Sequence, residues 1–113
     1  MTIYVSLPIT GYDLDERRRL AEAARLHLMA ENPGAEVRIP FDIADWVDAL
    51  NPQAMYADYM KEDIAFIIEK ADAVYFLVNP LTTRSKGVRL EYRTARIYGK
   101  RILRLAVRLS RNV

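Results

Sequence analysis

The sequence predicts an α/β domain in which an open, mostly parallel sheet carries helices on both faces. Three observations support this fold class. The continuous apolar run 73–78 is typical of a strand that is buried on both faces. Apolar residues recur at helical spacing in 14–30 and again in 53–70. Strands and helices also alternate along the chain, which favours parallel strands joined by crossover helices.

The amino-terminal part predicts one strand and one long helix. Residues 2–6 alternate weakly and are rich in β-branched side chains, so they form the first strand. Asp13 or Asp15 is the candidate N-cap of a helix over 14–30. The Asn-Pro-Gly sequence at 32–34 ends this helix, because it favours a turn.

The middle of the chain predicts a short strand and a second helix. The strand is expected at 36–40. We interpret 41–50 as a linker with some helical character that could line a ligand pocket, and Trp46 within it as a packing anchor rather than a base-stacking residue. Pro52 suits the first turn of a helix, and the apolar stripe in 53–70 predicts a strong helix there.

The carboxy-terminal part predicts the last helix between two strands. The buried strand at 73–78 is followed by a loop over 79–87. A helix over 88–98 ends at Gly99, which is a suitable C-cap residue. The final strand is expected within 100–107.

Composition indicates one globular domain, residues 1–113. With 51% hydrophobic and 28% charged residues, the chain is not expected to be disordered. It has no cysteine, which excludes disulfides and thiolate catalysis. The single histidine, His27, cannot support a multi-histidine metal site, and we expect neither a metal nor a cofactor.

Hydropathy predicts a protein without a membrane-spanning segment. No apolar run approaches the ~20 residues that a membrane span needs. The first residues contain no basic signal-peptide region. We therefore expect a cytoplasmic protein with no membrane partner.

Basic residues are concentrated at the carboxy-terminal end. From Arg84 onward there are ten Lys or Arg residues and one acid, Glu91. Two interpretations stay open: a solvated helix face with a basic terminus, or attraction of a phosphorylated ligand. Nucleic-acid binding is the least favoured, because no recognition motif is present and Tyr92 and Tyr98 are the only aromatic residues in this stretch.

The segment 85–91 follows the buried strand and carries the strongest functional signal. In α/β proteins, ligands bind at the carboxyl ends of strands, and the N-terminus of a helix favours an anion. Ser85 offers a hydroxyl donor, and Gly87 allows close approach to the backbone. Glu91 is either a first-turn acid stabilised by the helix dipole or a nucleophile or general base. The long loop before it favours the functional interpretation.

Other polar residues could join Glu91. Asp63 is either an exposed helix acid or a carboxylate that faces Glu91, and two carboxylates in one cleft can divide acid and nucleophile roles. Tyr4 is either a core aromatic or a hydrogen-bond donor that orients Glu91, and Ser6 stands at the carboxyl end of the same strand. Asp72, at a strand entry, is expected to make local backbone hydrogen bonds.

Three blocks of sequence resemble the nucleoside 2-deoxyribosyltransferase-like superfamily. They are 3–11, the helix-to-strand block 60–75, and Ser85-x-Gly87-x-x-x-Glu91 followed by 99–102. Within that superfamily the chain looks like a DUF4406 protein. The resemblance implies a flavodoxin-like or Rossmann-like fold and an activity on the N-glycosidic bond of nucleosides or nucleotides, by hydrolysis or by deoxyribosyl transfer.

The resemblance also implies roles for individual residues. Glu91 matches the nucleophile that attacks the anomeric carbon, Asp63 matches the acid that assists departure of the base, and Tyr4 matches a tyrosine that positions the glutamate. Ser85 stands where similar transferases carry a sugar-binding aspartate. A serine at this place is similar to the nucleotide 5′-monophosphate N-glycosidases, where it contacts the phosphate.

The same similarity assigns the second half of a phosphate cradle to Ile9, Thr10 and Gly11. Lys86 and Arg89 fit an anionic ligand. The first loop differs from that of the nucleotide hydrolases, which contains more glycine and an arginine.

Members of the superfamily often complete each site with a residue from a neighbouring subunit. Ser110 or Asn112 could serve here, so a homodimer or larger homo-oligomer is implied. The alternative function is a non-catalytic nucleotide-binding or sensor module that uses the same cleft.

Overall fold

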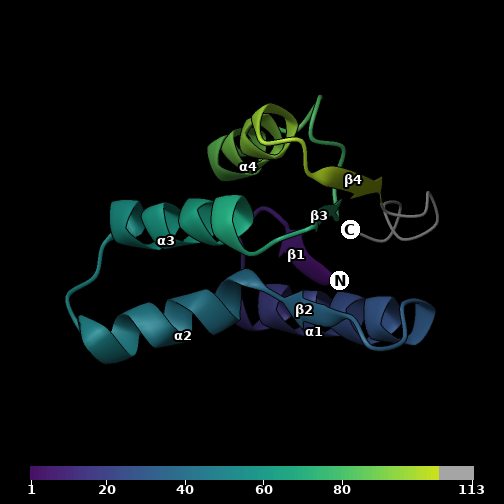
Figure 1. The fold of residues 1–113 in the computed structure, drawn as a ribbon. Coiled ribbons are helices and arrows are strands. Elements are labelled where there is room, and N and C mark those ends of the chain that lie inside the picture. Colours follow the sequence, from purple (N-terminus) through teal and green to yellow (C-terminus); the bar gives the residue numbers. More distant parts are fainter. Residues whose placement is uncertain (105–113) are drawn as a thin grey trace.

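The computed structural model describes residues 1–104 (Figure 1). The strands are β1 (Thr2–Ser6), β2 (Glu36–Arg38), β3 (Ala73–Phe76) and β4 (Arg101–Arg104). The helices are α1 (Leu14–Glu31), α2 (Pro40–Leu50), α3 (Tyr56–Glu69) and α4 (Lys86–Ile97). The four strands form one parallel, open sheet, which confirms the predicted α/β class and is compatible with a Rossmann-like or flavodoxin-like fold.

The strand order in the sheet is β2-β1-β3-β4. Tyr4 pairs in register with Arg38 of β2 on one side and with Val74 of β3 on the other. The chain therefore moves outward from β1 to β2 and then crosses to the opposite side of β1. This reversal between β1 and β3 is the place where open α/β sheets hold ligands, at the carboxyl ends of the strands.

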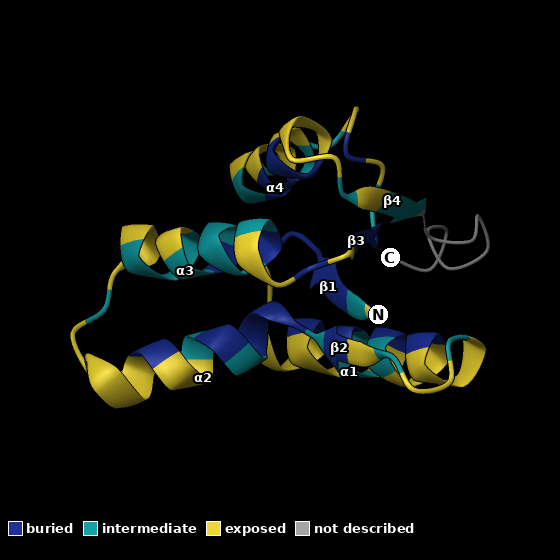
Figure 2. Ribbon diagram, in the orientation of Figure 1, coloured by how far each residue is buried: buried dark blue, intermediate teal, exposed yellow. Residues whose placement is uncertain are grey.

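Helices cover both faces of the sheet, as predicted, and Figure 1 shows α1 and α4 on opposite sides of the strands. On the α1 face, Ile3 and Val5 pack with Leu28. On the other face, Tyr4 packs with residues of α2, α3 and α4, including Ile67 and Val88. Figure 2 shows the buried residues gathered along the strands and the inward helix faces.

Caps and turns fix the helix ends near the expected places. Asp13 is the N-cap of α1, and its Oδ1 accepts a hydrogen bond from the Glu16 amide at 3.0 Å. After α1 the chain turns at Gly34, and after α4 it turns at Gly99, where φ is +84° and +67°. These left-handed conformations favour glycine because it has no Cβ.

The structure corrects three expectations in the middle of the chain. The presumed linker is the complete helix α2, with Pro40 in its first turn and the Asp42 carboxylate accepting a hydrogen bond from the Ile39 amide at 3.1 Å. Helix α3 begins at Tyr56 rather than beside Pro52, because residues 51–55 form a turn. Trp46 is 54% exposed and is not a packing anchor.

Asp72 has the structural role that was expected, but its contact is not local. Its Oδ2 accepts a hydrogen bond from the Thr2 amide at 2.8 Å, so it links the entry of β3 to that of β1. The predicted residues 105–107 of the last strand, together with Ser110 and Asn112, lie outside the described residues.

Within residues 1–104 we find no helix that is both long enough and apolar enough to cross a lipid bilayer.

Candidate active site

A buried carboxylate joins α4 to β1. Alternate residues of a strand point to the same face, so Tyr4 and Ser6 both face the α2–α4 side of the sheet. Tyr4 donates its hydroxyl proton to Oε2 of Glu91 at 2.6 Å. Ser6 donates to Oε1 of the same carboxylate at 2.7 Å. Tyr4 and Ser6 are fully buried and Glu91 is 4% exposed, so these bonds form away from bulk water.

Glu91 forms part of the wall of a cleft of about 510 Å³. The predicted site residues that also line this cleft are Ile9, Thr10, Asp63, Ser85 and Gly87. Tyr4 and Ser6 are buried and are not part of the lining, and neither is Gly11, which makes a turn with φ +89°. The structure therefore brings Asp63 and Glu91 to one cleft, with Tyr4 and Ser6 bonded to Glu91.

Asp63 is buried on the wall that α3 contributes. It is 6% exposed, and its Oδ1 has no hydrogen-bond partner within residues 1–104. Burial raises the pKa of Asp63 to about 8, and the nearby charge of Glu91 adds to the increase. Asp63 therefore retains a proton at neutral pH and can donate it to a ligand.

Glu91 has different surroundings from Asp63. Burial raises the pKa of Glu91 to about 7, while the hydrogen bonds from Tyr4 and Ser6 act in the opposite direction. These two hydroxyl donors stabilise the ionised form, so Glu91 loses its proton before Asp63 does. Burial also raises the pKa of Tyr4, with a further contribution from the Glu91 charge, so Tyr4 remains a donor.

The N-terminus of α4 is engaged in contacts of its own. Ser85 caps the helix, and its Oγ accepts a hydrogen bond from the Val88 amide at 3.2 Å. Gly87 lies against α3, since a Cβ built there would stand 3.2 Å from the Tyr56 hydroxyl and 3.5 Å from the sulfur of Met60. The glycine thus allows α3 and α4 to approach each other, and that side of its backbone is occupied.

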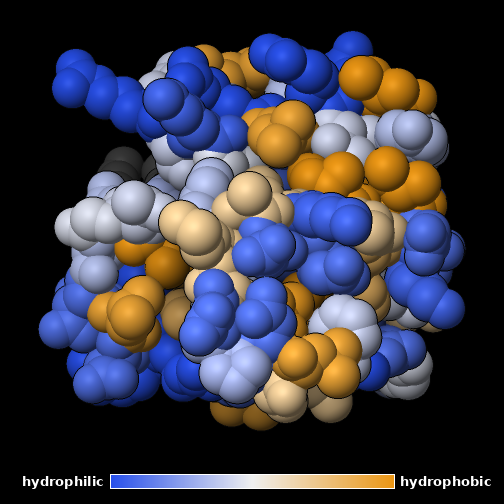
Figure 3. Space-filling model, turned by 90° about the vertical axis from the view of Figure 1, so that its left-hand side faces the viewer, coloured by the Kyte–Doolittle hydropathy of each residue, from blue (hydrophilic) through white to orange (hydrophobic). Residues whose placement is uncertain are grey.

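Several residues of the cleft were not predicted. Asp48, Tyr56 and Tyr59 line it near the connection between α2 and α3. Tyr59 donates to Oδ1 of Asp48 at 2.5 Å, which bridges the two helices. Figure 3 shows the side of the molecule on which this connection lies, where hydrophobic and hydrophilic surface is interspersed. The available signal for α2 was the helical spacing of Ile43, Val47 and Leu50.

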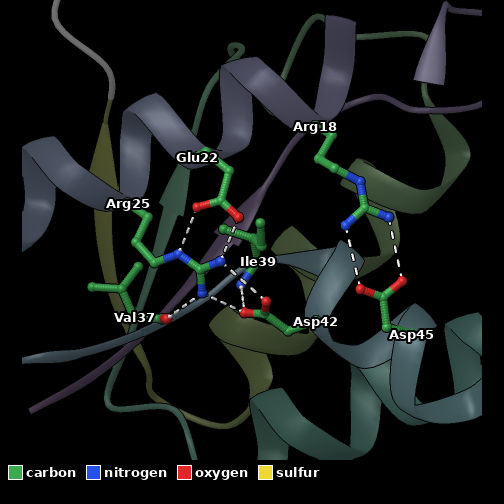
Figure 4. Close-up of polar contacts among 7 residues, drawn as sticks. All are labelled: Arg18, Glu22, Arg25, Val37, Ile39, Asp42 and Asp45. Atoms are coloured by element: carbon green, nitrogen blue, oxygen red, sulfur yellow. Dashed lines mark hydrogen bonds and ion pairs between the residues drawn. The ribbon is translucent and has the colours of Figure 1, made fainter. Parts of the chain in front are cut away.

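Two arginines of α1 hold α2 in place as a wall of the cleft (Figure 4). Arg25 binds Glu22 of its own helix, the Val37 carbonyl oxygen, and Asp42 of α2 through a 2.6 Å contact. Arg18 faces Asp45 of α2 with two parallel contacts of 3.3 Å.

The two cations that were expected to attract an anion lie elsewhere. Lys86 and Arg89 are exposed on α4, and neither lines the cleft. Among residues 1–104 the lining contains one basic side chain, Arg18.

Comparison with known proteins identifies a family without assigning an activity. No match is found among the curated proteins. Residues 1–104 match the family described as a domain of unknown function, DUF4406. This match extends over the whole described fold, including the strand and the helix that carry Tyr4 and Glu91. The chain therefore belongs to the DUF4406 family.

Proposed function

We propose that this protein cleaves the N-glycosidic bond of a nucleoside or of a nucleoside 5′-monophosphate, by hydrolysis or by deoxyribosyl transfer. One observation carries the proposal. Glu91 is held by two hydroxyl donors and shares a cleft with Asp63, a buried carboxyl group whose Oδ1 has no hydrogen-bond partner among residues 1–104. A paired nucleophile and acid of this kind is what displacement at an anomeric carbon requires.

In the first step, the ionised Glu91 attacks C1′ of the sugar. A bond forms between a carboxylate oxygen and C1′, and the bond from C1′ to the base nitrogen breaks. The electron pair of that bond goes to the base, and Asp63 transfers its proton to the departing base. Tyr4 and Ser6 hold the carboxylate in one orientation, which reduces the entropic cost of the attack.

In the second step, water or the nitrogen of another base attacks C1′. The bond to Glu91 breaks and its electron pair returns to the carboxylate. Asp63, now ionised, accepts the proton of the attacking group. The mechanism uses a deprotonated Glu91 and a protonated Asp63, so activity is expected between a rising limb near pH 7 and a falling limb near pH 8. These two limbs belong to the pair, since the carboxyl groups interact.

The direct test is chromatographic detection of free base. The full chain is incubated with ribo- and deoxynucleosides and with their 5′-monophosphates, beside the variants Glu91→Gln and Glu36→Gln. Glu91→Gln keeps the size of the side chain but removes the nucleophile, and we expect base release to fall at least about 10³-fold. Glu36 is exposed on β2 at the amino end of the sheet, so its variant should retain full activity.

Base release that persists in Glu91→Gln would contradict the mechanism. If the wild-type protein binds these ligands but releases no base from any of them, the function is instead that of a non-catalytic nucleotide-binding module. The cytoplasmic location, expected from hydropathy and the first residues, remains a prediction. The homo-oligomer that the superfamily resemblance implies also remains a prediction, and sedimentation of the full chain measures it.

A further inference from the structure

We propose that the cleft selects an uncharged nucleoside and disfavours the corresponding 5′-monophosphate. The inference rests on the proposed function for the class of ligand. It concerns the charge of that ligand, because the superfamily resemblance implied a phosphate contact at Ser85. Asp63 is buried on the cleft wall, and its Oδ1 has no partner in the described part of the chain, 1–104, which indicates that this cavity receives a polar ligand. The remaining charged groups of the lining then decide which ligand is accepted.

The cleft is acidic along its described lining. Its charged residues are Asp15, Arg18, Asp45, Asp48, Asp63 and Glu91. Even when Asp63 and Glu91 both carry a proton, three carboxylates stand against one guanidinium group. A phosphate monoester carries a charge of about −1.5 to −2 at pH 7, so it would enter a cavity with charge of the same sign.

The one cation of the lining is already paired. Two nitrogens of Arg18 face the two oxygens of Asp45, each at 3.3 Å, in the fork arrangement seen in Figure 4. The same guanidinium lies over the ring of Phe41, 4.7 Å from its centre. A phosphate could reach Arg18 only through its remaining N–H donors, because the positive charge is already offset by Asp45. The phosphate would then lie close to the Asp45 carboxylate, which carries charge of the same sign.

The N-terminus of α4 offers an anion fewer free donors than an uncapped helix end. The Ser85 amide donates to Oγ1 of Thr83 at 3.2 Å, and the Val88 amide donates to Oγ of Ser85, so two donors of this loop are used internally. Tyr56 and Met60 occupy the space beside Gly87. A nucleoside needs no cation here, since its hydroxyl groups can donate to carboxylates such as Asp15 and Asp48.

The experiment measures binding without turnover. Full-length protein with Glu91→Gln is titrated calorimetrically with each deoxynucleoside and with its 5′-monophosphate. We expect the dissociation constant of the monophosphate to be at least about tenfold higher, because like charges are brought together. The difference should shrink as ionic strength rises, since salt screens charges near the surface.

A matched pair of variants in the same background tests the origin of the preference. Asp45→Asn removes one carboxylate and leaves Arg18 free, so the ratio of the two dissociation constants should fall severalfold. Glu36→Gln makes the same change in net charge and also breaks an ion pair, the one with Arg38, but outside the cleft. The ratio for this variant should equal that of the unmodified background.

Each outcome separates this inference from the proposed function. A monophosphate that binds as tightly as the nucleoside, or tighter, overturns the inference, even if wild-type protein releases base. Equal effects of Asp45→Asn and Glu36→Gln also overturn it, because the preference would then come from overall charge. A nucleoside preference in a protein that releases no base supports the inference and contradicts the enzymatic function. No binding of any nucleoside overturns the inference, and it overturns the proposed function as well if the wild-type protein releases no base.

Discussion

The two faces of the sheet bury different chemistry. On the α1 face, Ile3 and Val5 contact an apolar helix side, and this half of the core is closed by side chains such as Leu28. On the other face, Tyr4 and Ser6 of the same strand hold a carboxylate. Since buried charges destabilise a fold, the buried carboxylate lowers the free energy of unfolding, and apolar packing on the α1 face offsets this loss. Alternate residues of β1 point to opposite faces, so the residues on one face stabilise the fold and those on the other face form the candidate site.

After Glu91→Gln, replacing Asp63 should give the next large loss of activity. Asp63→Asn removes the proton donor, and we expect base release to fall about 10²- to 10⁴-fold. The matched control is Glu62→Gln on the preceding residue of α3, which lines a different hollow beside Trp46 and should keep its activity. Equal losses of activity in both variants would show that the effect comes from a disturbance of α3 rather than from removal of the Asp63 carboxyl group.

The same variant should also change the pH dependence of stability. The pKa of Asp63 is about 8 in the folded protein and 3.8 for an ordinary aspartate, so its protonated form favours folding below about pH 4, and this contribution is lost as pH rises toward 8. At pH 8 the free energy of unfolding of Asp63→Asn should therefore exceed that of the wild type, by an amount on the order of a few kcal/mol. Urea unfolding of both proteins at pH 4 and pH 8 measures this, and a difference between them that stays the same at the two pH values would contradict the pKa assignment.

On the apolar face, the expected effect is on stability alone. Leu28 is 3% exposed, and Leu28→Ala should lower the free energy of unfolding by about 2–5 kcal/mol. Activity per folded molecule should not change, because Leu28 lies far along α1 from the cleft residues of its first turns. Leu26→Ala is the control on the same helix: this side chain is 69% exposed, and the change should stay within about 0.5 kcal/mol.

The smallest effect is expected from one hydroxyl group. Tyr4→Phe removes a donor to Glu91, so base release should fall about tenfold or more. The rising limb of the pH profile should move to higher pH, because the ionised carboxylate loses a stabilising partner. Tyr75→Phe makes the same change on the α1 face of the sheet, where it should leave the pH profile as it is. If Tyr4 has only a structural role, the rising limb of Tyr4→Phe will stay at the pH of the wild type.

Much of the fold was predictable because local signals agreed with the tertiary structure. Strands and helices were predicted close to their observed bounds from three local signals: the apolar run 73–78, the Asp13 cap and the Gly99 turn. For Tyr4, the sequence left two interpretations open: a core aromatic residue, or a donor to Glu91. The pattern placed Tyr4 in one strand and Glu91 past the carboxyl end of another, but it did not show whether the two side chains meet.

The missed elements share a physical cause. Pro40 was assigned to the end of a strand, whereas it begins α2, and the Asp42 carboxylate caps that helix. The region 41–50 was expected to line a pocket, but its helical form was not predicted, and neither were the contacts of Asp45 and Asp48. These contacts join helices that are distant in sequence, so no local pattern contains them.

The Arg25 network has a mechanical consequence. This arginine links α1, the end of β2 and the first turn of α2 through one guanidinium group. Helix α3 joins these elements through the turn at 51–55, the Tyr59–Asp48 contact and the apolar packing that Val47 and Ile67 share. It also packs against α4, where Gly87 lies beside Met60. Asp63 and Glu91 therefore stand on two helices whose separation is set by side-chain packing, so a change in that packing would alter the distance between the two carboxyl groups.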